Sequence, residues 1–311
     1  MILQVSGRTD IVAYYTNWFI ERLRAGYCFV RNPIYPTIVY RYDLRPQAID
    51  AIIFCSKNYT PILKYMPKLL SSYNIVCHYT ITAFEEDIEP NVPSIDVSIE
   101  TLIKLSRLIG KERVIWRFDP ILFTKKYSAS YIIEKFAYIL EKIAPYIQRI
   151  IFSFVEEYAK VKRNMPELIT LSKEDKNALA KELSRLAKKH GIILQTCGTT
   201  EDYKSFGIIP SGCTTPQILY EATKQSFQKK KGTPKRIGCT CLPTRDIGAY
   251  NTCPHACKYC YANLTPSSSL KTIQQHDVHS PIFLGKLLDS DTIKEAPSLT
   301  FLDKRMTLFD L

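Results

Sequence analysis

The sequence lacks several features that would assign the protein to a familiar class. It has no run of about 18 apolar residues, so we expect no membrane-spanning segment. Arg8 and Asp10 stand where a secretory signal needs an apolar stretch, which argues against such a signal and predicts a cytoplasmic protein. No glycine-rich fingerprint follows the first predicted strand, which disfavours a dinucleotide-binding fold. Internal repeats and low-complexity tracts are also missing.

The chain does have enough apolar sequence for a large core, and it has an excess of positive charge. Of its 311 residues, 46% are hydrophobic, which excludes wholesale disorder. At roughly 150 residues per domain, the length predicts one large domain with a smaller addition. Lys and Arg number 42 and Asp and Glu 30, for a net charge of +12, which suggests an anionic partner.

Short apolar runs alternate with helical stretches over the first two thirds of the chain and predict an α/β fold. We expect strands at 2–5, 51–55, 75–82, 114–118, 150–155 and 192–196, and helices at 11–24, 61–70, 94–108, 131–143 and 173–189. About six such units predict parallel strands with right-handed crossovers. A TIM-like β/α barrel, complete or partial, and an open doubly wound sheet both fit. We predict the barrel because nearly every strand ends in polar residues, which a barrel gathers on one face.

Charged side chains at these strand ends are the candidate catalytic residues. Arg or Lys there can hold the carboxylate of a cofactor or an anionic substrate, and carboxylates can bind hydroxyls or move protons. The alternative for Arg117 and Asp119 is that they pair with each other and brace the barrel mouth. His78, inside an apolar strand, is expected to be a hydrogen-bonded core residue. The candidates are Arg8, Asp10, Lys57, Arg117, Asp119 and Glu156.

The pattern changes beyond the predicted barrel. We expect a barrel domain at 1–205, a Cys-rich cluster-binding segment at 206–265 and a tail at 266–311 that packs on the barrel. The run 224–236 holds six basic residues and no acidic one. It predicts an exposed loop that could follow a nucleic-acid backbone, although Phe227 is its only aromatic residue. The terminal RMTLFDL (305–311) resembles a degenerate sliding-clamp-binding peptide of bacteria; the alternative is that it packs on its own domain.

Cysteines are concentrated in the second half, where seven of the ten fall within residues 197–260. Because thiols stay reduced in the cytoplasm, this concentration indicates metal binding rather than disulfides. Cys253, Cys257 and Cys260 have the spacing C-x3-C-x2-C. Three thiolates at this spacing can bind three irons of a [4Fe-4S] cluster and leave the fourth iron open, and an open position suits catalysis.

This spacing, with Tyr259 before the last cysteine, resembles the motif of the radical S-adenosylmethionine (SAM) superfamily. The resemblance implies that the open iron chelates SAM, that an electron from the cluster cleaves its sulfonium, and that Tyr259 lies beside the adenine. It also implies an electron donor such as a flavodoxin or ferredoxin. In most members the motif follows the first strand, whereas here it follows the sixth. Contacts to SAM therefore do not transfer by position.

The whole chain also resembles a bacterial family known as a domain of unknown function, whose C-terminal cysteines are likened to the radical SAM motif. The resemblance implies the same barrel and cluster, and it supplies no substrate. It rests on phrases spread along the chain: SGRTD at 6–10, Asn32 to Pro36, Glu89 to Pro93, Trp116 to Pro120, Ser153 to Val155, Leu194 to Cys197 and Gly248 to Asn263.

Four further cysteines are candidate metal ligands: Cys197, Cys213, Cys239 and Cys241. Four is the number for a second, fully ligated [4Fe-4S] cluster that relays an electron or binds substrate. A zinc ion at these four, Cys241 completing the first site, and Cys197 as a plain core residue are the alternatives. Cys28, Cys55 and Cys77 are expected in the core.

Radical SAM-type catalysis on an unknown substrate is the main functional prediction. The first alternative is a non-catalytic iron-sulfur or zinc protein that binds nucleic acid through the basic loop. His255 or His279 could be a fourth ligand if the motif holds zinc. The second is a metal-independent barrel hydrolase or lyase with a structural zinc lid. A ferredoxin-like carrier is disfavoured, because no fourth cysteine follows Cys260.

Overall fold

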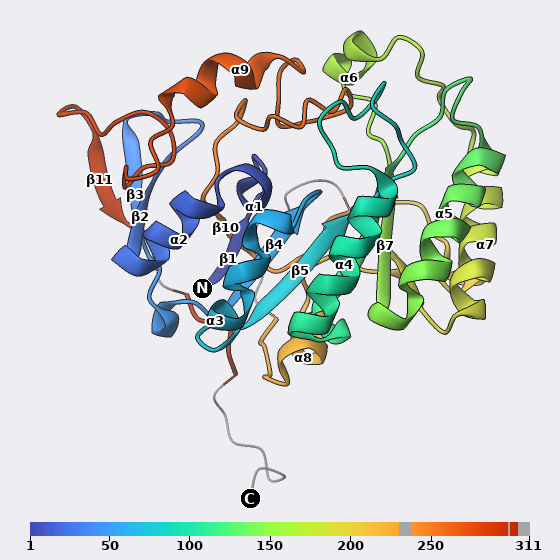
Figure 1. Cartoon of the computed structure of the whole chain (residues 1–311), viewed down its shortest axis with the longest axis horizontal. Helices are drawn as coiled ribbons and strands as arrows, with labels where there is room; N and C mark the ends of the chain where they lie inside the picture. The colour runs from blue at the N-terminus through green and yellow to red at the C-terminus, as the bar shows by residue number, and fades with distance from the viewer. Residues whose placement is uncertain (230–237, 298, 304–311) are drawn as a thin grey trace, which may run out of the picture.

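The computed structural model describes residues 1–229, 238–297 and 299–303 (Figure 1). Its centre is an eight-stranded parallel sheet in the order β10-β1-β4-β5-β6-β7-β8-β9. The strands are β1 (Ile2–Val5), β4 (Ala51–Ser56), β5 (Ile75–Thr80), β6 (Val114–Ile121), β7 (Arg149–Phe154), β8 (Ile193–Thr196), β9 (Ile209–Pro210) and β10 (Arg245–Asp246).

The order of the strands bears on the choice between a barrel and a doubly wound sheet. From β1 to β9 the strands of this sheet follow one another in sequence, without the reversal that marks a doubly wound fold. Within the described residues, pairing runs from β10 at one edge to β9 at the other, and none joins the two edges. The predicted parallel α/β sheet is confirmed, whereas the pairing does not show closure into a barrel.

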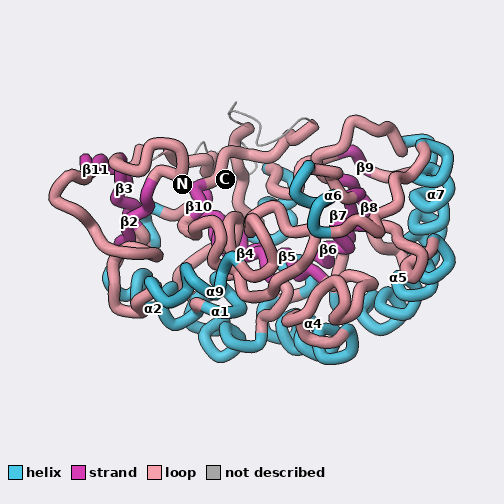
Figure 2. The backbone as a smooth tube through the Cα atoms, turned by 90° about the horizontal axis from the view of Figure 1, so that it is seen from above, coloured by secondary structure: helices cyan, strands magenta, loops and turns pink. Residues whose placement is uncertain are grey.

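Helices cover one face of this sheet (Figure 2). Right-handed crossovers between sequentially ordered parallel strands place the connecting helices on the same side. Alternate strand residues such as Phe54, Tyr79 and Trp116 pack against these helices in the main core. The helices are α1 (Ile11–Tyr14), α2 (Thr16–Ala25), α3 (Met66–Leu70), α4 (Ile95–Ile109), α5 (Ala129–Ile143) and α7 (Lys173–Lys189), and α6 (Ala159–Asn164) lies between β7 and α7 in the chain.

Trp116 of β6 is fully buried in this core. Its ring stacks on Phe136 of α5 with centroids 5.0 Å apart, and its Nε1 donates to the Ile81 carbonyl at 2.9 Å. We expect Trp116→Ala to lower the free energy of unfolding by about 3–5 kcal/mol, because it leaves a large cavity. Urea unfolding followed by circular dichroism measures this loss. A loss below about 1 kcal/mol, typical of surface substitutions, would contradict the packing.

The C-terminal part of the chain covers the opposite face. α8 (Pro216–Thr223) and the side chains of Leu242 and Phe301 pack there against alternate strand residues: Ile2, Ile53, Val76, Ile115 and Ile151. Arg149 of β7 ties α8 to the sheet by donating to Glu221 at 2.8 Å. This face would be the interior of a barrel, and the chain fills it with its own later segments.

A second, three-stranded sheet has no counterpart among the predicted elements. β2 (Tyr27–Arg31) and β3 (Ile38–Asp43) form an antiparallel hairpin, and β11 (Thr292–Glu295) pairs in parallel with β3. The tail therefore returns to the N-terminal part of the chain, and it also contains α9 (Ser268–Thr272). Within the described residues, no helix is long and apolar enough to cross a membrane.

Candidate functional site

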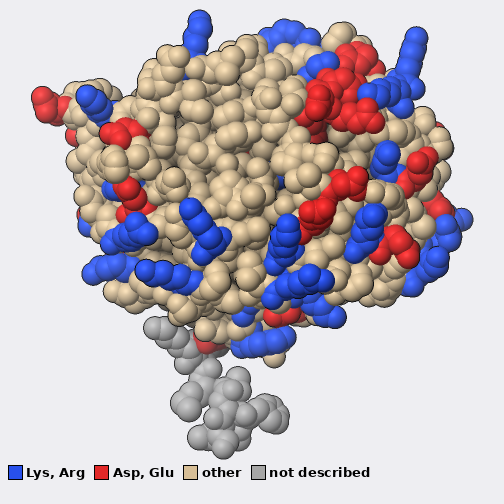
Figure 3. Space-filling view, in the orientation of Figure 1, with Lys and Arg blue, Asp and Glu red and all other residues tan. Residues whose placement is uncertain are grey.

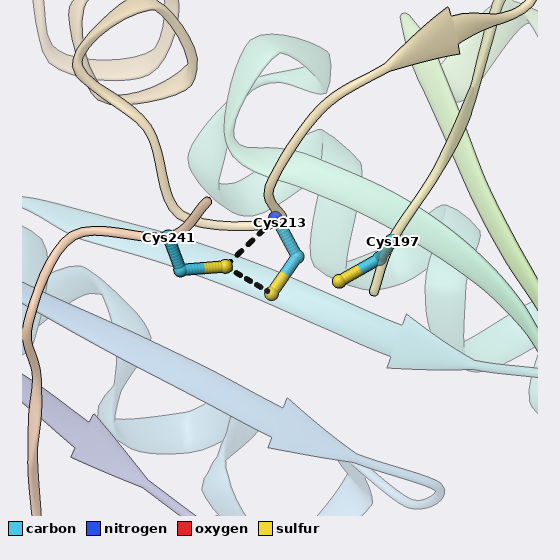
Figure 4. A group of neighbouring side chains, drawn as sticks. All are labelled: Cys197, Cys213 and Cys241. Atoms are coloured by element: carbon cyan, nitrogen blue, oxygen red, sulfur yellow. Dashed lines mark hydrogen bonds between the residues drawn. The ribbon is translucent and has the colours of Figure 1, made fainter. Parts of the chain in front are cut away.

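Three of the predicted ligand cysteines form a compact group (Figure 4). The sulfurs of Cys197, Cys213 and Cys241 all lie within 4.8 Å of one another, and those of Cys213 and Cys241 are 3.4 Å apart. Cys197 is buried and the other two are half-buried. The fourth predicted member, Cys239, is outside the group and lines a neighbouring cavity of about 270 Å³. The fold thus assembles a three-thiol site able to hold a metal ion or cluster.

A close backbone approach holds this three-cysteine group together. A Cβ at Gly212 would lie 2.7 Å from the Cys241 nitrogen, so only glycine permits this contact. The Cys213 amide donates to the Cys241 sulfur at 3.1 Å, and the Leu242 amide donates to the Thr214 carbonyl at 2.8 Å. These contacts clamp the 212–214 turn onto the segment that leads into β10.

Arg117 supplies positive charge beside the group. Burial opposes that charge, but Asp119 and the thiols of Cys213 and Cys197 raise the pKa of Arg117 well above its usual value. Hydrogen bonds from Cys197 and Cys241, helped by the charge of Arg117, lower the pKa of Cys213 well below that of a free thiol. Arg117 and Asp119 pair with each other, which is the alternative given for them from the sequence, and Ser153 donates to Asp119. The site therefore favours a thiolate at Cys213.

The motif cysteines gather at the carboxyl ends of β1 and β4. Cys253 and Cys257 are buried and Cys260 is half-buried, but their sulfurs do not all lie within 4.8 Å of one another. Burial and then Glu89 raise the pKa of Cys257, and Cys260 and Cys253 add to this effect. The Ala262 amide donates to the Cys260 sulfur at 3.3 Å. The loop thus places three thiols near one another, and their sulfurs are not as close together as in the group of Cys197, Cys213 and Cys241.

Asp10 and His255 anchor the motif loop to β1. Asp10 accepts from the Ala13 amide at 2.9 Å at the start of α1, and it contacts His255 Nε2 at 2.9 Å. Because a carboxylate only accepts, Nε2 donates to Asp10, and Nδ1 lies 3.0 Å from both the Tyr14 hydroxyl and the Asn91 carbonyl. His255 is therefore engaged away from the thiols. His279, the other proposed zinc ligand, is exposed and contacts Glu21.

We expect His255→Ala to loosen this loop. The change leaves the buried Asp10 carboxylate without one charged or polar partner, which costs about 1.5–3 kcal/mol for a hydrogen bond to a charged group. Limited proteolysis followed by mass spectrometry then finds faster cleavage between 251 and 263 than in the parent. His279→Ala is the matched control, because its ring is 76% exposed. Equal cleavage rates in the two variants would argue against the anchor.

Lys57, Glu89 and Tyr259 form a polar cluster beside the motif, in which Glu89 is buried and the other two are half-buried. Lys57 Nζ lies 2.9 Å from Glu89, whose carboxylate also accepts from Thr82 at 2.7 Å and from the Tyr259 hydroxyl. Burial disfavours the Lys57 charge, but Glu89 and Cys257 outweigh it and raise its pKa. Lys57 therefore places a cation next to the motif thiols.

A cavity of about 260 Å³ opens beside the segment that precedes the motif. Its lining includes Arg8, Arg31, Asn32 and Tyr250. Arg8 donates to Asp246 at 3.1 Å, and its guanidinium lies 5.9 Å from the centre of the Tyr250 ring. The volume is near the lower end for small-molecule sites. Three of the phrases that carry the family resemblance, at 6–10, 32–36 and 248–263, meet at this cavity.

Comparison with known proteins identifies the family. The family described as "Domain of unknown function (DUF1848)" matches residues 2–262. The chain belongs to this family. No curated protein and no solved structure matches it.

The DUF1848 match covers both cysteine groups, the polar cluster around Lys57 and most of the cavity lining, whereas Ile282, Phe283 and Leu284 of that lining lie beyond it. It ends within the motif block, so β11 and the rest of the tail lie beyond it. Both thiol groups therefore lie within the residues that the family model matches, and the tail does not.

Some predicted residues lie apart from these sites or outside the described residues. Glu156 is half-buried after β7, where it accepts from the Tyr158 hydroxyl. Of the basic run, residues 230–236 lie outside the described residues, as does all of 305–311, and Phe227 is buried in the second core. On the face in Figure 3, Lys and Arg side chains are interspersed with Asp and Glu.

Glu89 and Tyr14 have site contacts that sequence reasoning missed. Glu89 belongs to the EPNVP segment, which supports the family resemblance but does not indicate that Glu89 contacts the site. Tyr14 sits in an ordinary helical pattern, and its contact with His255 spans 241 positions. Such long-range contacts depend on how the loops cross the sheet, which periodicity does not reveal.

Proposed function

We propose that the protein is an iron-sulfur enzyme of the radical SAM type, with its catalytic cluster at Cys253, Cys257 and Cys260. One observation carries the proposal: two buried motif thiols and one half-buried thiol lie together near Asp10 and Lys57, which follow β1 and β4, yet they are not as close as the ligands of a single ion. Cluster ligands bind different irons and stand farther apart than ligands of one ion.

The donor set fits such a cluster. Burial raises the pKa of Cys253 and of Cys257, and a metal ion that binds these thiols displaces their protons. The Ala262 amide is already directed at the Cys260 sulfur, and hydrogen bonds to cluster sulfurs tune reduction potential. When bound, a [4Fe-4S] cluster with one open iron supplies an electron to the sulfonium of SAM.

The surrounding side chains have separate tasks in this proposal. Lys57 offsets negative charge beside Cys257, and Glu89 holds its ammonium group in place. Burial raises the pKa of Tyr259 well above its usual value, so its hydroxyl keeps its proton and stays bonded to Glu89. The Asp10–His255 contact holds the motif loop against β1.

The cavity beside Arg8 is our candidate for the substrate position. It lies next to residues 247–250, just before the motif, and Arg8 gives it a cation suited to an anionic group. We also propose that the parallel sheet is a partial barrel whose interior is filled by α8 and by the side chains of Phe227, Leu242 and Phe301. The helices on a single face and the sequential strand order support this architecture.

A product assay tests the proposed activity. Anaerobically reconstituted full-length protein, reduced with dithionite, is expected to convert SAM to 5′-deoxyadenosine and methionine, which chromatography separates. The protein with all three motif cysteines changed to alanine is the control. Equal product from both proteins, or none from either when iron is bound, would refute the proposal.

A further inference from the structure

The spacing of the sulfurs of Cys197, Cys213 and Cys241 distinguishes a single ion from a cluster. In a tetrahedral site with metal–sulfur bonds of about 2.3 Å, neighbouring sulfurs lie about 3.8 Å apart. Thiolates on different irons of a cubane lie roughly 6 Å apart. Here all three sulfurs lie within 4.8 Å, and one pair is 3.4 Å apart. This spacing matches a mononuclear site.

A tetrahedral ion needs a fourth ligand, and β5 offers one. His78 is on the same sheet face as Val76, which packs in the second buried cluster with the three cysteines. The His78 side chain is fully buried, and within the described part of the chain neither ring nitrogen has a hydrogen-bond partner. A buried imidazole without a hydrogen-bond partner lowers the stability of the folded protein, and a bound metal ion would remove this cost.

His78 also lies close to the group. It is the next residue after Val76 on this face of β5, and the backbone of Cys213 lies beside its ring. In Figure 4 a strand with the colour of β5 passes behind Cys213 and Cys241. The ring is not itself within 4.8 Å of all three sulfurs, so the proposed site requires the ring and the sulfurs to move closer together when the ion binds. A neutral imidazole is the form that binds metal.

We propose that one zinc-class divalent ion is bound at this place by three thiolates and one imidazole, from Cys197, Cys213, Cys241 and His78. Thiolate ligands favour zinc over magnesium or calcium. With four protein ligands the site is closed, so its task is structural. It fastens the 212–214 turn and the segment at Cys241 to β5 and to the end of β8. The proposal goes beyond the proposed catalytic function and does not depend on it.

The test uses full-length protein in which Cys253, Cys257 and Cys260 are alanine, so that the motif contributes no thiols. This background is expected to bind one zinc ion per chain. His78→Asn is expected to weaken zinc binding by more than the roughly 10- to 100-fold that loss of an outer-shell partner costs. Cys77→Ala is the matched control: it is on the same strand, fully buried, and faces the opposite core. It is expected to bind zinc like the background.

A second variant covers misfolding of His78→Asn. His78→Cys restores four ligands and is expected to bind zinc again. Its cobalt-substituted form should show the absorption of four thiolates instead of three thiolates and one nitrogen. Zinc binding by His78→Asn with background affinity would overturn the proposal. So would loss of zinc in Cys239→Ser, or identical cobalt spectra for His78→Cys and its background. Failure of this test leaves the iron and product assays unaffected, because they measure the motif site.

Discussion

Replacing Cys253, Cys257 and Cys260 together by alanine is expected to remove about four iron atoms per chain from the reconstituted protein, one [4Fe-4S] cluster. The three thiols are the only ligands that the proposal assigns to the cluster, and three alanines leave iron no thiolate there. Iron, sulfide and zinc analysis of anaerobically purified protein measures the loss. Zinc at the other group should stay at one per chain.

The reciprocal variant sharpens this prediction. Changing Cys197, Cys213 and Cys241 to serine should abolish zinc and keep the four irons. Cys28→Ala is the control, because Cys28 is fully buried and belongs to neither group. About eight irons in the parent that fall to four in either triple variant would instead indicate two clusters. Zinc alone, without iron, would refute the radical SAM proposal.

Lys57→Met should produce the largest loss of stability among the charged residues. Glu89 is 3% exposed and Lys57 is 12% exposed, so the change leaves a buried carboxylate without its cation. Removing one partner of a buried pair costs about 3–5 kcal/mol. Glu89 keeps its bonds from Thr82 and Tyr259, which do not neutralise its charge. Urea unfolding of the metal-free protein measures the free energy.

Two further variants test the cause of that loss. Lys57→Met combined with Glu89→Gln removes the uncompensated charge and should recover most of the stability. Lys126→Met is the matched surface control, because Lys126 is 48% exposed and contacts Glu85 at 2.9 Å. It should cost less than about 1 kcal/mol. If the two single lysine variants lose the same free energy, the buried pair does not carry the effect.

The parallel sheet could be predicted because its signals are local. Runs such as AIIFC at 51–55 and VIWRF at 114–118 match β4 and the start of β6, and the amphipathic stretch at 94–108 matches α4. The β2–β3 hairpin was missed, since its residues alternate between buried and half-buried positions without a long apolar run. The pairing of β11 with β3 joins segments too distant for any local pattern.

The cysteine sites were predictable by residue type but not by grouping. Clustering in sequence identified Cys197, Cys213 and Cys241 as candidates, and the fold brings these three together. The sequence around Cys239 and Cys241 does not indicate which of the two belongs to the group. The close approach of the chain to Gly212 brings Cys241, rather than Cys239, to the other two sulfurs. The apolar strand around His78 predicts a core histidine. The three-dimensional structure is needed to show that its ring has no hydrogen-bond partner and lies near Cys213.

Electron paramagnetic resonance of the reduced, reconstituted protein with and without SAM tests the central claim most directly. SAM can change the cluster signal only where one iron is open to bind it. The account predicts a SAM-dependent change in the parent and in the Cys197, Cys213 and Cys241 triple serine variant, with no cluster signal in the motif triple alanine variant. A cluster signal that does not change when SAM is added would contradict the account. So would a cluster signal in the variant that lacks Cys253, Cys257 and Cys260.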